Sequence, residues 1–279
     1  MDPLSALEGI AADAARGDIV FPTHTDIALR VQRRLDDPDC SSEALVKLLA
    51  AEPLLSARVL SLANSTAYNP GGRSITDLKN AVARIGYAAL RALTASTVVR
   101  QMQGMSNDPA HRAIAARLWE HTTHVASLAR LLARRVTRQN PDAAFFAGVV
   151  HEVGSFYLIS RAAAFPGLLE GERTLETWCG DGEALVGRAV LKALDVPASV
   201  AEAMEVLWGG YLAMPPSSLG DTLLLANELA PVESPLDALE SMSRKNLPVE
   251  LDLLINDETL TSILAESADE VQSLRQALA

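Results

Sequence analysis

Residues 118–136 read LWEHTTHVASLARLLARRV, and this stretch decides the fold class. Its apolar side chains recur at steps of seven, three and four residues, which is the spacing of one face of an α-helix. The members of this stripe are Leu118, Val125, Leu128, Leu132 and Val136. A histidine occupies the gap in the stripe, three residues after Leu118 and four before Val125, so we expect its ring to point inward. The stretch predicts a buried helix with an interior histidine, His121.

The same helical periodicity runs along nearly the whole chain. Segments that alternate apolar and polar residues, with the β-branched and aromatic enrichment of strands, are missing from the sequence. We therefore predict an all-α fold of two packed helical bundles. The polar segment 104–109 is the expected boundary between them. The predicted division is an N-terminal bundle at residues 1–104, a second bundle at 109–230 and an acidic helical extension at 231–279.

The composition is that of an ordinary folded protein. Of 279 residues, 49% are hydrophobic and 21% are charged, which excludes a disordered or low-complexity chain. The longest uninterrupted apolar run, residues 143–150, is shorter than the roughly 20 residues of a membrane-spanning helix. The first residues show no secretory signal, and Cys40 and Cys179 lie far apart. We expect a cytoplasmic protein with free thiols and no membrane contact.

The net charge of −11 hides two oppositely charged segments. Residues 84–138 hold nine arginines and two acidic residues, whereas residues 169–279 hold six basic and twenty acidic residues. Such segments either form separate solvated faces or attract each other where domains meet. A basic docking surface for a partner or a phosphate group is the alternative. Nucleic-acid binding by residues 84–138 is the least favoured function, because the whole chain is acidic.

His121, His124 and the pair His151-Glu152 are the residues best suited to metal chemistry. The small residues of the 144–148 segment form a helix face that would let another backbone or a ligand approach His151. Two imidazoles and a carboxylate from neighbouring helices are suitable ligands for a divalent metal ion. Buried histidines satisfied by a hydrogen bond fit the same pattern, and no metal-finger spacing occurs. We favour this structural interpretation, with no metal and no cofactor.

Three sequence elements carry a resemblance to a known family. Residues 51–65 (AEPLLSARVLSLANS) end in Asn-Ser, residues 75–86 (ITDLKNAVARIG) end in Ile-Gly, and residues 145–154 (FFAGVVHEVG) hold an Ala-Gly-x-x-His element. In this order, with Phe-Pro at 21–22 and LWEH at 118–121, they resemble the HDOD domain, the HD-related output domain of bacterial signalling. The resemblance spans about residues 18–230. It implies a multi-helix fold related to the HD phosphohydrolases.

The resemblance also assigns positions to the metal site of the HD phosphohydrolases. Its first histidine corresponds to His121, its His-Asp pair to His151-Glu152, and its last aspartate to Asn227. The acidic residue of the pair is therefore a glutamate, whose side chain is one methylene longer than that of aspartate. The last position holds the neutral amide of an asparagine. A His-His that many family members carry near Trp208 is absent. Since a hydrolytic metal needs fixed anionic ligands and an open coordination position, we expect a degenerate site without catalytic residues.

Five further residues are candidates for an interaction surface between the two bundles: Asn64, Ser65, Arg91, Trp119 and Trp208. Asn64 and Ser65 also fit a helix end that holds the following loop by side-chain hydrogen bonds, which we favour. The two tryptophans fit ordinary core positions. If they were exposed together, they would mark a partner surface.

These observations favour a non-catalytic regulatory protein of bacterial signal transduction that acts through protein–protein interaction. Its partner would be an unknown signalling protein acting in trans, because the chain leaves no room for a second large domain. The alternative is a metal-dependent HD-type phosphohydrolase that acts on nucleotides or cyclic dinucleotides. That enzyme would contain stoichiometric metal and would lose activity in His151→Ala. No serine-nucleophile elbow, Walker phosphate loop or dinucleotide fingerprint offers another activity.

Overall fold

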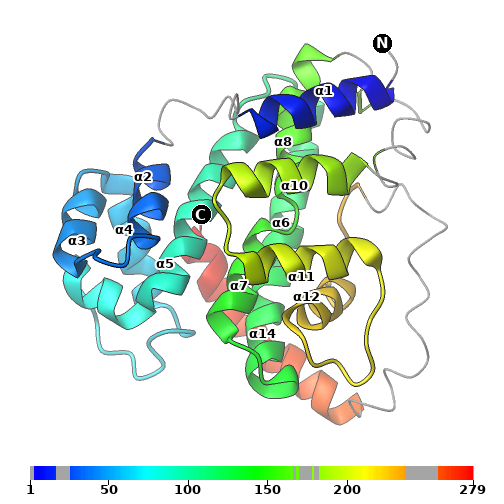
Figure 1. Ribbon diagram of the computed structural model, residues 1–279. Coiled ribbons are helices and arrows are strands. Elements are labelled where there is room, and N and C mark those ends of the chain that lie inside the picture. The colour runs from blue at the N-terminus through cyan, green and yellow to red at the C-terminus, as the bar shows by residue number, and fades with distance from the viewer. Residues whose placement is uncertain are drawn as a thin grey trace.

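The computed structural model describes residues 3–16, 26–165, 168–169, 178, 182–236 and 257–278. Within these ranges the regular structure is helical and no strand occurs, which confirms the predicted all-α class (Figure 1). The elements are α1 (Pro3–Ala15), α2 (Asp26–Leu35), α3 (Ser42–Ala50), α4 (Pro53–Asn64), α5 (Leu78–Gln103), α6 (Pro109–Leu132), the π-helical turn η1 (Ala133–Thr137), α7 (Pro141–Val150), α8 (Val153–Arg161), the 3-10 turn η2 (Ala162–Ala164), α10 (Glu183–Ala193), α11 (Ala198–Gly209), α12 (Leu219–Glu228) and α14 (Asp257–Leu278).

Local signals in the sequence set many helix boundaries. Pro53, Pro109 and Pro141 lie in the first turns of α4, α6 and α7, where a missing N–H group costs no hydrogen bond. The Asp77 carboxylate caps α5 by accepting a hydrogen bond of 2.8 Å from a backbone N–H in the first turn. Gly86 has φ 75° inside α5, a value that favours glycine, and it divides this helix into two parts with a kink.

The helices α2, α3 and α4 form a group at one side of the molecule, and α5 leads from them to the helices around α6 (Figure 1). α5 packs against α2 and α4 and also against α7 and α8. α1 packs on α10, with Leu7 and Ile10 fully buried, although the predicted division groups it with residues 1–104. One continuous apolar core joins residues from α1 to α14. The division into bundles stays a prediction.

α6 and α7 pack backbone against backbone. A Cβ atom placed on Gly148 of α7 would lie 2.4 Å from the Cα atom of Ala126 on α6, a distance that real Cβ atoms do not reach. Glycine at this position therefore permits the close approach of the two helices. The sequence left open whether the small-residue face of α7 would meet another backbone or a ligand. In the structure this face meets the backbone of α6 at Ala126. This packing places His151, at the end of α7, beside α6.

Residues 141–161, which form α7 and α8, are long and apolar enough to cross a membrane. However, 94% of the apolar window lies buried inside the protein, as expected of core helices. Cys40 is a free, half-buried thiol. Cys179 and the Phe-Pro pair at 21–22 lie outside the described residues. A cytoplasmic location stays an expectation.

Candidate functional site

Four side chains from different helix segments meet in the interior. His121 lies in the middle of α6, His151 is the C-cap of α7, Glu152 is the N-cap of α8, and Asn227 lies near the end of α12. The exposed fractions of the first three are 1%, 3% and 5%. The structure therefore brings together the four positions that the resemblance assigns to a degenerate metal site. We call these four residues the His121 cluster.

The side-chain nitrogen and oxygen atoms of the His121 cluster lie close enough together to bind the same proton or metal ion. His121 Nε2 lies 3.1 Å from His151 Nε2 and 3.1 Å from Asn227 Oδ1. The ligand atoms of His121, His151 and Glu152 all lie within 4.8 Å of one another. By contrast, His124, one turn further along α6, faces a separate cavity beside α14. The sequence pattern alone did not separate the roles of these two histidines.

A backbone carbonyl orients each imidazole. His121 Nδ1 lies 2.7 Å from the Val232 oxygen, and His151 Nδ1 lies 2.8 Å from the Gly148 oxygen. Because a carbonyl oxygen only accepts, both Nδ1 atoms carry the hydrogen and donate it. The two Nε2 atoms then present lone pairs to each other and to the Asn227 amide oxygen. Acceptors that face acceptors require a shared proton or a cation between them.

The protonation of the buried groups follows from their surroundings. Burial lowers the pKa of His151 to about 4, and the nearby Glu152 only partly offsets this effect. Burial, the largest influence on Glu152, acts to raise its pKa. The imidazoles of His151 and His121 outweigh it, together with the hydroxyl groups of Ser155 and Ser234, and the pKa is lowered. Burial therefore favours the uncharged form of His151, whereas the surrounding groups favour the ionised form of Glu152.

A divalent cation is the group that the fold family implies at this site. The donors fit an ion by type and spacing, because imidazole nitrogen, carboxylate oxygen and amide oxygen are all accepted ligands. Such an ion would cross-link α6, α12 and the α7–α8 corner, and a hydrolytic one would also activate a bound water. Glu152 supplies the only negative charge among the four residues, and the neutral amide of Asn227 would offset less of the charge of a divalent ion than a carboxylate would. A catalytic ion also keeps one coordination position open for water or substrate.

Asn64 and Ser65 hold a loop. The Asn64 side-chain amide donates to the Leu60 and Ile75 carbonyl oxygens at 2.9 and 2.7 Å, and its oxygen accepts from the Ile75 N–H at 2.8 Å. The Ser65 hydroxyl is buried and donates to the Leu62 oxygen at 2.7 Å. Both residues thus use their polar atoms internally, as the favoured interpretation expects.

The other three candidates for an interaction surface have different surroundings. Arg91 on α5 pairs with Asp36, which follows α2. Trp119 is only 8% exposed and packs edge-to-face on Phe156, with 6.2 Å between ring centres. Trp208 on α11 is half-buried. Because Trp119 is buried, the two tryptophans form no exposed surface together.

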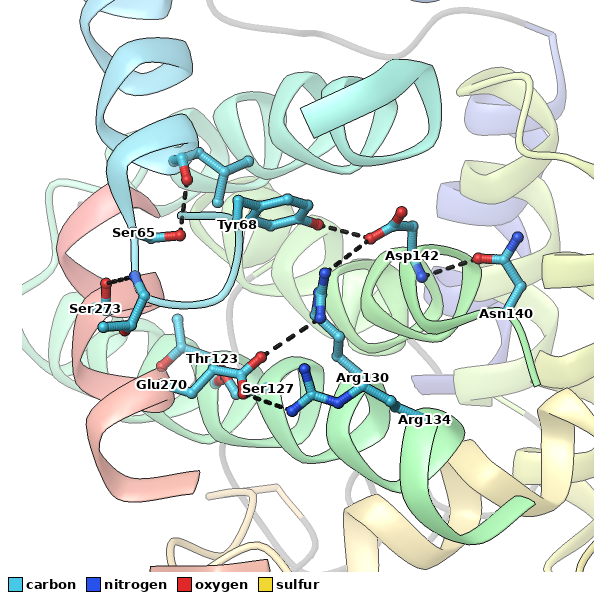
Figure 2. A network of polar contacts seen from close by, with 12 residues as sticks. Ser65, Tyr68, Thr123, Ser127, Arg130, Arg134, Asn140, Asp142, Glu270 and Ser273 are labelled. Atoms are coloured by element: carbon cyan, nitrogen blue, oxygen red, sulfur yellow. Dashed lines mark hydrogen bonds and ion pairs between the residues drawn. The ribbon is translucent and has the colours of Figure 1, made fainter. Parts of the chain in front are cut away.

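A second buried polar cluster was missed by sequence reasoning. Figure 2 shows Arg130 of α6 between two carboxylates: Asp142 of α7 at 3.4 Å and Glu270 of α14 at 3.5 Å. The guanidinium carbon lies 4.4 Å from the ring centre of Tyr68, whose hydroxyl donates to Asp142 at 2.8 Å. Arg134 also pairs with Glu270. We call these five residues the Arg130 cluster. The basic and acidic segments therefore attract each other here, one of the two outcomes their charges allowed.

Fold and site together define a class: an all-α protein with an HD-like fold and a buried cluster of two histidines, a glutamate and an asparagine. The family model of the HDOD domain matches residues 21–207, and the chain belongs to this family. The resemblance derived from the sequence motifs is thereby confirmed. No curated protein matches the chain.

Solved structures share the fold over nearly the whole length. A protein from Shewanella amazonensis SB2B, provisionally named a metal-dependent phosphohydrolase, superposes with a TM-score of 0.73 at 23% identity and 99% coverage of both chains. An HDOD domain protein of unknown function from Geobacter sulfurreducens gives 0.62 at 22% identity, covering 99% of this chain and 98% of that one. A provisionally named signal transduction protein from Marinobacter aquaeolei VT8 gives 0.60 at 17% identity, covering 100% and 67%. At these identities the likeness establishes the fold alone.

Proposed function

We propose that this HDOD protein is a non-catalytic regulatory component of bacterial signal transduction that acts through protein–protein interaction. The observation that carries the proposal is the state of the His121 cluster. Its last position holds the neutral Asn227, which lies 3.1 Å from His121 where the fold family has a carboxylate. His121, His151 and Glu152 are at most 5% exposed, and Asn227 is half-buried. Hydrolysis needs fixed anionic ligands around an accessible metal centre, and this cluster supplies a single carboxylate, Glu152.

The internal hydrogen bonds of the cluster support a scaffold role. Val232 and Gly148 hold the two imidazoles, so the cluster links α6, α7 and the segment after α12. Such a link needs no substrate and no turnover. We therefore assign the His121 cluster to the stability of the fold, and we assign the function to the outer surface of the protein.

We place the partner surface at the bundle junction, where α4, the end of α5 and the start of α6 meet. A hollow of about 410 Å³ lies there, and its walls include Leu54, Arg58 and Arg112. Leu54 is 53% exposed, which is unusual for a large apolar side chain, and Arg112 is exposed. The described walls of the hollow contain no carboxylate. This combination suits an acidic segment of a signalling protein that carries an apolar side chain.

The first experiment separates the regulatory protein from the phosphohydrolase. The purified protein is analysed for Mn, Fe and Zn, loaded with each metal, and assayed on nucleotides and cyclic dinucleotides beside His151→Ala. We expect the two proteins to give the same background rate. A wild-type rate well above that of His151→Ala, with stoichiometric metal, would establish the enzyme and reject the proposal.

The second experiment tests the partner surface with a matched pair of variants. Arg112→Glu and Arg117→Glu both reverse an exposed charge on α6, but only Arg112 lines the hollow. After cross-linking in a native lysate, a protein recovered by wild type and Arg117→Glu should be lost with Arg112→Glu. Equal recovery by all three proteins rejects the bundle junction as the partner surface.

A further inference from the structure

A cavity separate from both clusters lies beneath the C-terminal helix. It is bounded by α5, α6, the segment after α12 and α14, and its volume is about 920 Å³. That size is within the range of about 300–1,000 Å³ that is typical of small-molecule sites. Neither His121 nor Glu152 is among its walls, so the cavity does not belong to the degenerate metal site.

Most of the cavity wall is apolar. Trp119 and Leu128 of α6, Leu229 and Pro231 after α12, and Val271 of α14 supply this surface. The Trp119 ring is fixed from behind by its edge-to-face packing, so it offers a rigid wall. A cavity of this kind favours a hydrocarbon or aromatic body over a polar molecule.

The charged groups of the wall are cationic. Arg100 of α5 places its guanidinium carbon 5.3 Å from the ring centre of Trp119 and donates a hydrogen bond to the neutral Gln103 oxygen. Among the described residues, Arg100 forms no ion pair, and burial lowers its pKa, as expected of a cation that is removed from water without compensation. Arg275 of α14 lies at the same cavity and pairs with Glu120 at 3.4 Å.

We propose that this cavity binds an amphipathic organic anion, with its apolar body against Trp119 and Leu128 and its anionic head on Arg100. Arg100 has no carboxylate partner in the described part of the chain and lies beside an apolar cavity, so an anionic ligand would supply the missing charge. The site goes beyond the proposed regulatory function, although Arg100 also lines the hollow at the bundle junction; the probe titrations need no partner, so they test the site separately from that function. Because α14 forms one wall, the ligand would be enclosed between this helix and the rest of the protein.

The test uses two fluorescent probes that share an anilinonaphthalene body. 1-Anilinonaphthalene-8-sulfonate carries an anionic head, whereas N-phenyl-1-naphthylamine is neutral. Titration of the full chain should give saturable binding of the sulfonate at one site. In Arg100→Met the dissociation constant of the sulfonate should rise about tenfold, while that of the neutral probe stays unchanged, because only the charged contact is lost. Arg117→Met, an exposed arginine on α6 outside the cavity, is the matched control and should change neither probe.

A third variant fills the space without touching the core. Ala268 is exposed on α14 and lines the cavity, so Ala268→Trp should weaken both probes while the circular dichroism spectrum stays that of a folded protein. Laurate and dodecyl phosphate are then used to displace the sulfonate, and displacement by either supports the site and assigns its preferred head group. Unsaturable binding, equal sulfonate affinity in wild type and Arg100→Met, or no displacement by either competitor overturns the proposal.

Discussion

Helix α6 carries two buried polar clusters whose central residues, His121 and Arg130, are nine residues apart, and the clusters differ in charge. The His121 cluster holds one carboxylate, Glu152, beside two imidazoles and an amide. The Arg130 cluster holds a guanidinium between the carboxylates of Asp142 and Glu270. Charge is retained in a protein interior where it is paired, and removing one member of a pair is costly. The comparison indicates that charge is concentrated in the cluster that joins α14 to the rest of the protein, whereas the His121 cluster holds a single carboxylate.

The Arg130 cluster joins segments that are distant in sequence. Figure 2 shows the loop after α4, the start of α7 and the helix α14 all reaching Arg130. Burial acts to lower the pKa of Arg130, but Tyr68, Asp142 and Glu270 outweigh it and raise the pKa, so the guanidinium stays charged. A further hydrogen bond of 3.0 Å joins the Thr66 N–H to the Ser273 hydroxyl on α14. α14 is therefore fixed to the loop that follows α4 as well as to α6.

The largest expected effect comes from removing the central cation. In Arg130→Met the buried carboxylate of Glu270 and the half-buried carboxylate of Asp142 lose their shared partner, while an unbranched side chain still fills part of the space. We expect the free energy of unfolding to fall by about 3–5 kcal/mol, the usual cost of breaking a buried ion pair. Urea denaturation measures this loss, and amide exchange should show α14 losing protection first.

The control for this variant is an arginine in an exposed pair. Arg34 pairs with Asp37, and the two side chains are 51% and 34% exposed. Arg34→Met should cost less than about 1 kcal/mol, because exposed ion pairs contribute little. If Arg130→Met and Arg34→Met lower the free energy of unfolding by equally small amounts, the Arg130 cluster does not stabilise the fold. The proposed difference between the Arg130 cluster and the His121 cluster would then be wrong.

The second prediction concerns pH and the His121 cluster. Burial holds the pKa of His151 at about 4, whereas an unfolded histidine titrates near 6.5. Between these values the unfolded chain binds a proton that the folded chain does not, so stability is lost as the pH falls from about 6.5 toward 4. The loss should reach about 3 kcal/mol by the lower end of this window. Urea denaturation at a series of pH values, in the presence of a chelator, measures it.

The variant His151→Gln isolates this contribution. It removes the titrating group, so its stability should change much less between pH 6.5 and 5 than that of wild type. His111→Gln, at a half-buried histidine that contacts Ser106, is the matched control and should keep the wild-type slope. A wild-type stability that is flat across this window would mean that His151 takes up its proton in the folded state, and the neutral form of His151 described above would be wrong.

The sequence predicted the elements of the His121 cluster but not its state. The apolar stripe of α6 places His121 inward, and the motif resemblance pairs it with His151, Glu152 and Asn227. Periodicity reports which face of a helix is buried, but it does not report which carbonyl orients an imidazole. The Val232 oxygen, 2.7 Å from His121, belongs to an irregular segment without a motif. The convergence of acceptors is therefore visible only in the structure.

The Arg130 cluster could not be predicted residue by residue, for a related reason. Tyr68, Asp142 and Glu270 lie in segments that only the tertiary fold brings to Arg130. An isolated arginine or glutamate on a helix is most often solvated, so composition gave only the opposite charges of the two segments. The small-residue face of α7 is the intermediate case. Its pattern indicated a close approach at Gly148, and the structure identifies the approaching group as the backbone of Ala126.

The smallest expected effect concerns one hydrogen bond of the Arg130 cluster. Tyr68→Phe removes the hydroxyl that donates to Asp142 at 2.8 Å and keeps the ring beneath Arg130. We expect a loss of about 1 kcal/mol in the free energy of unfolding, the ordinary net contribution of a hydrogen bond. Tyr87→Phe, at a tyrosine that is 44% exposed, is the control and should stay within about 0.5 kcal/mol of wild type.

Combining this variant with Arg130→Met in a double-mutant cycle tests whether the cluster acts as one unit. With Arg130 present, Asp142 is shared between the guanidinium and the Tyr68 hydroxyl, so the two contacts constrain the same carboxylate. In Arg130→Met the hydroxyl becomes a more important partner for the uncompensated Asp142, and Tyr68→Phe should then cost more than it does in wild type. Additive losses would show that the contacts are independent, and the Arg130 cluster would then be a set of separate interactions with no cooperative hold on α14.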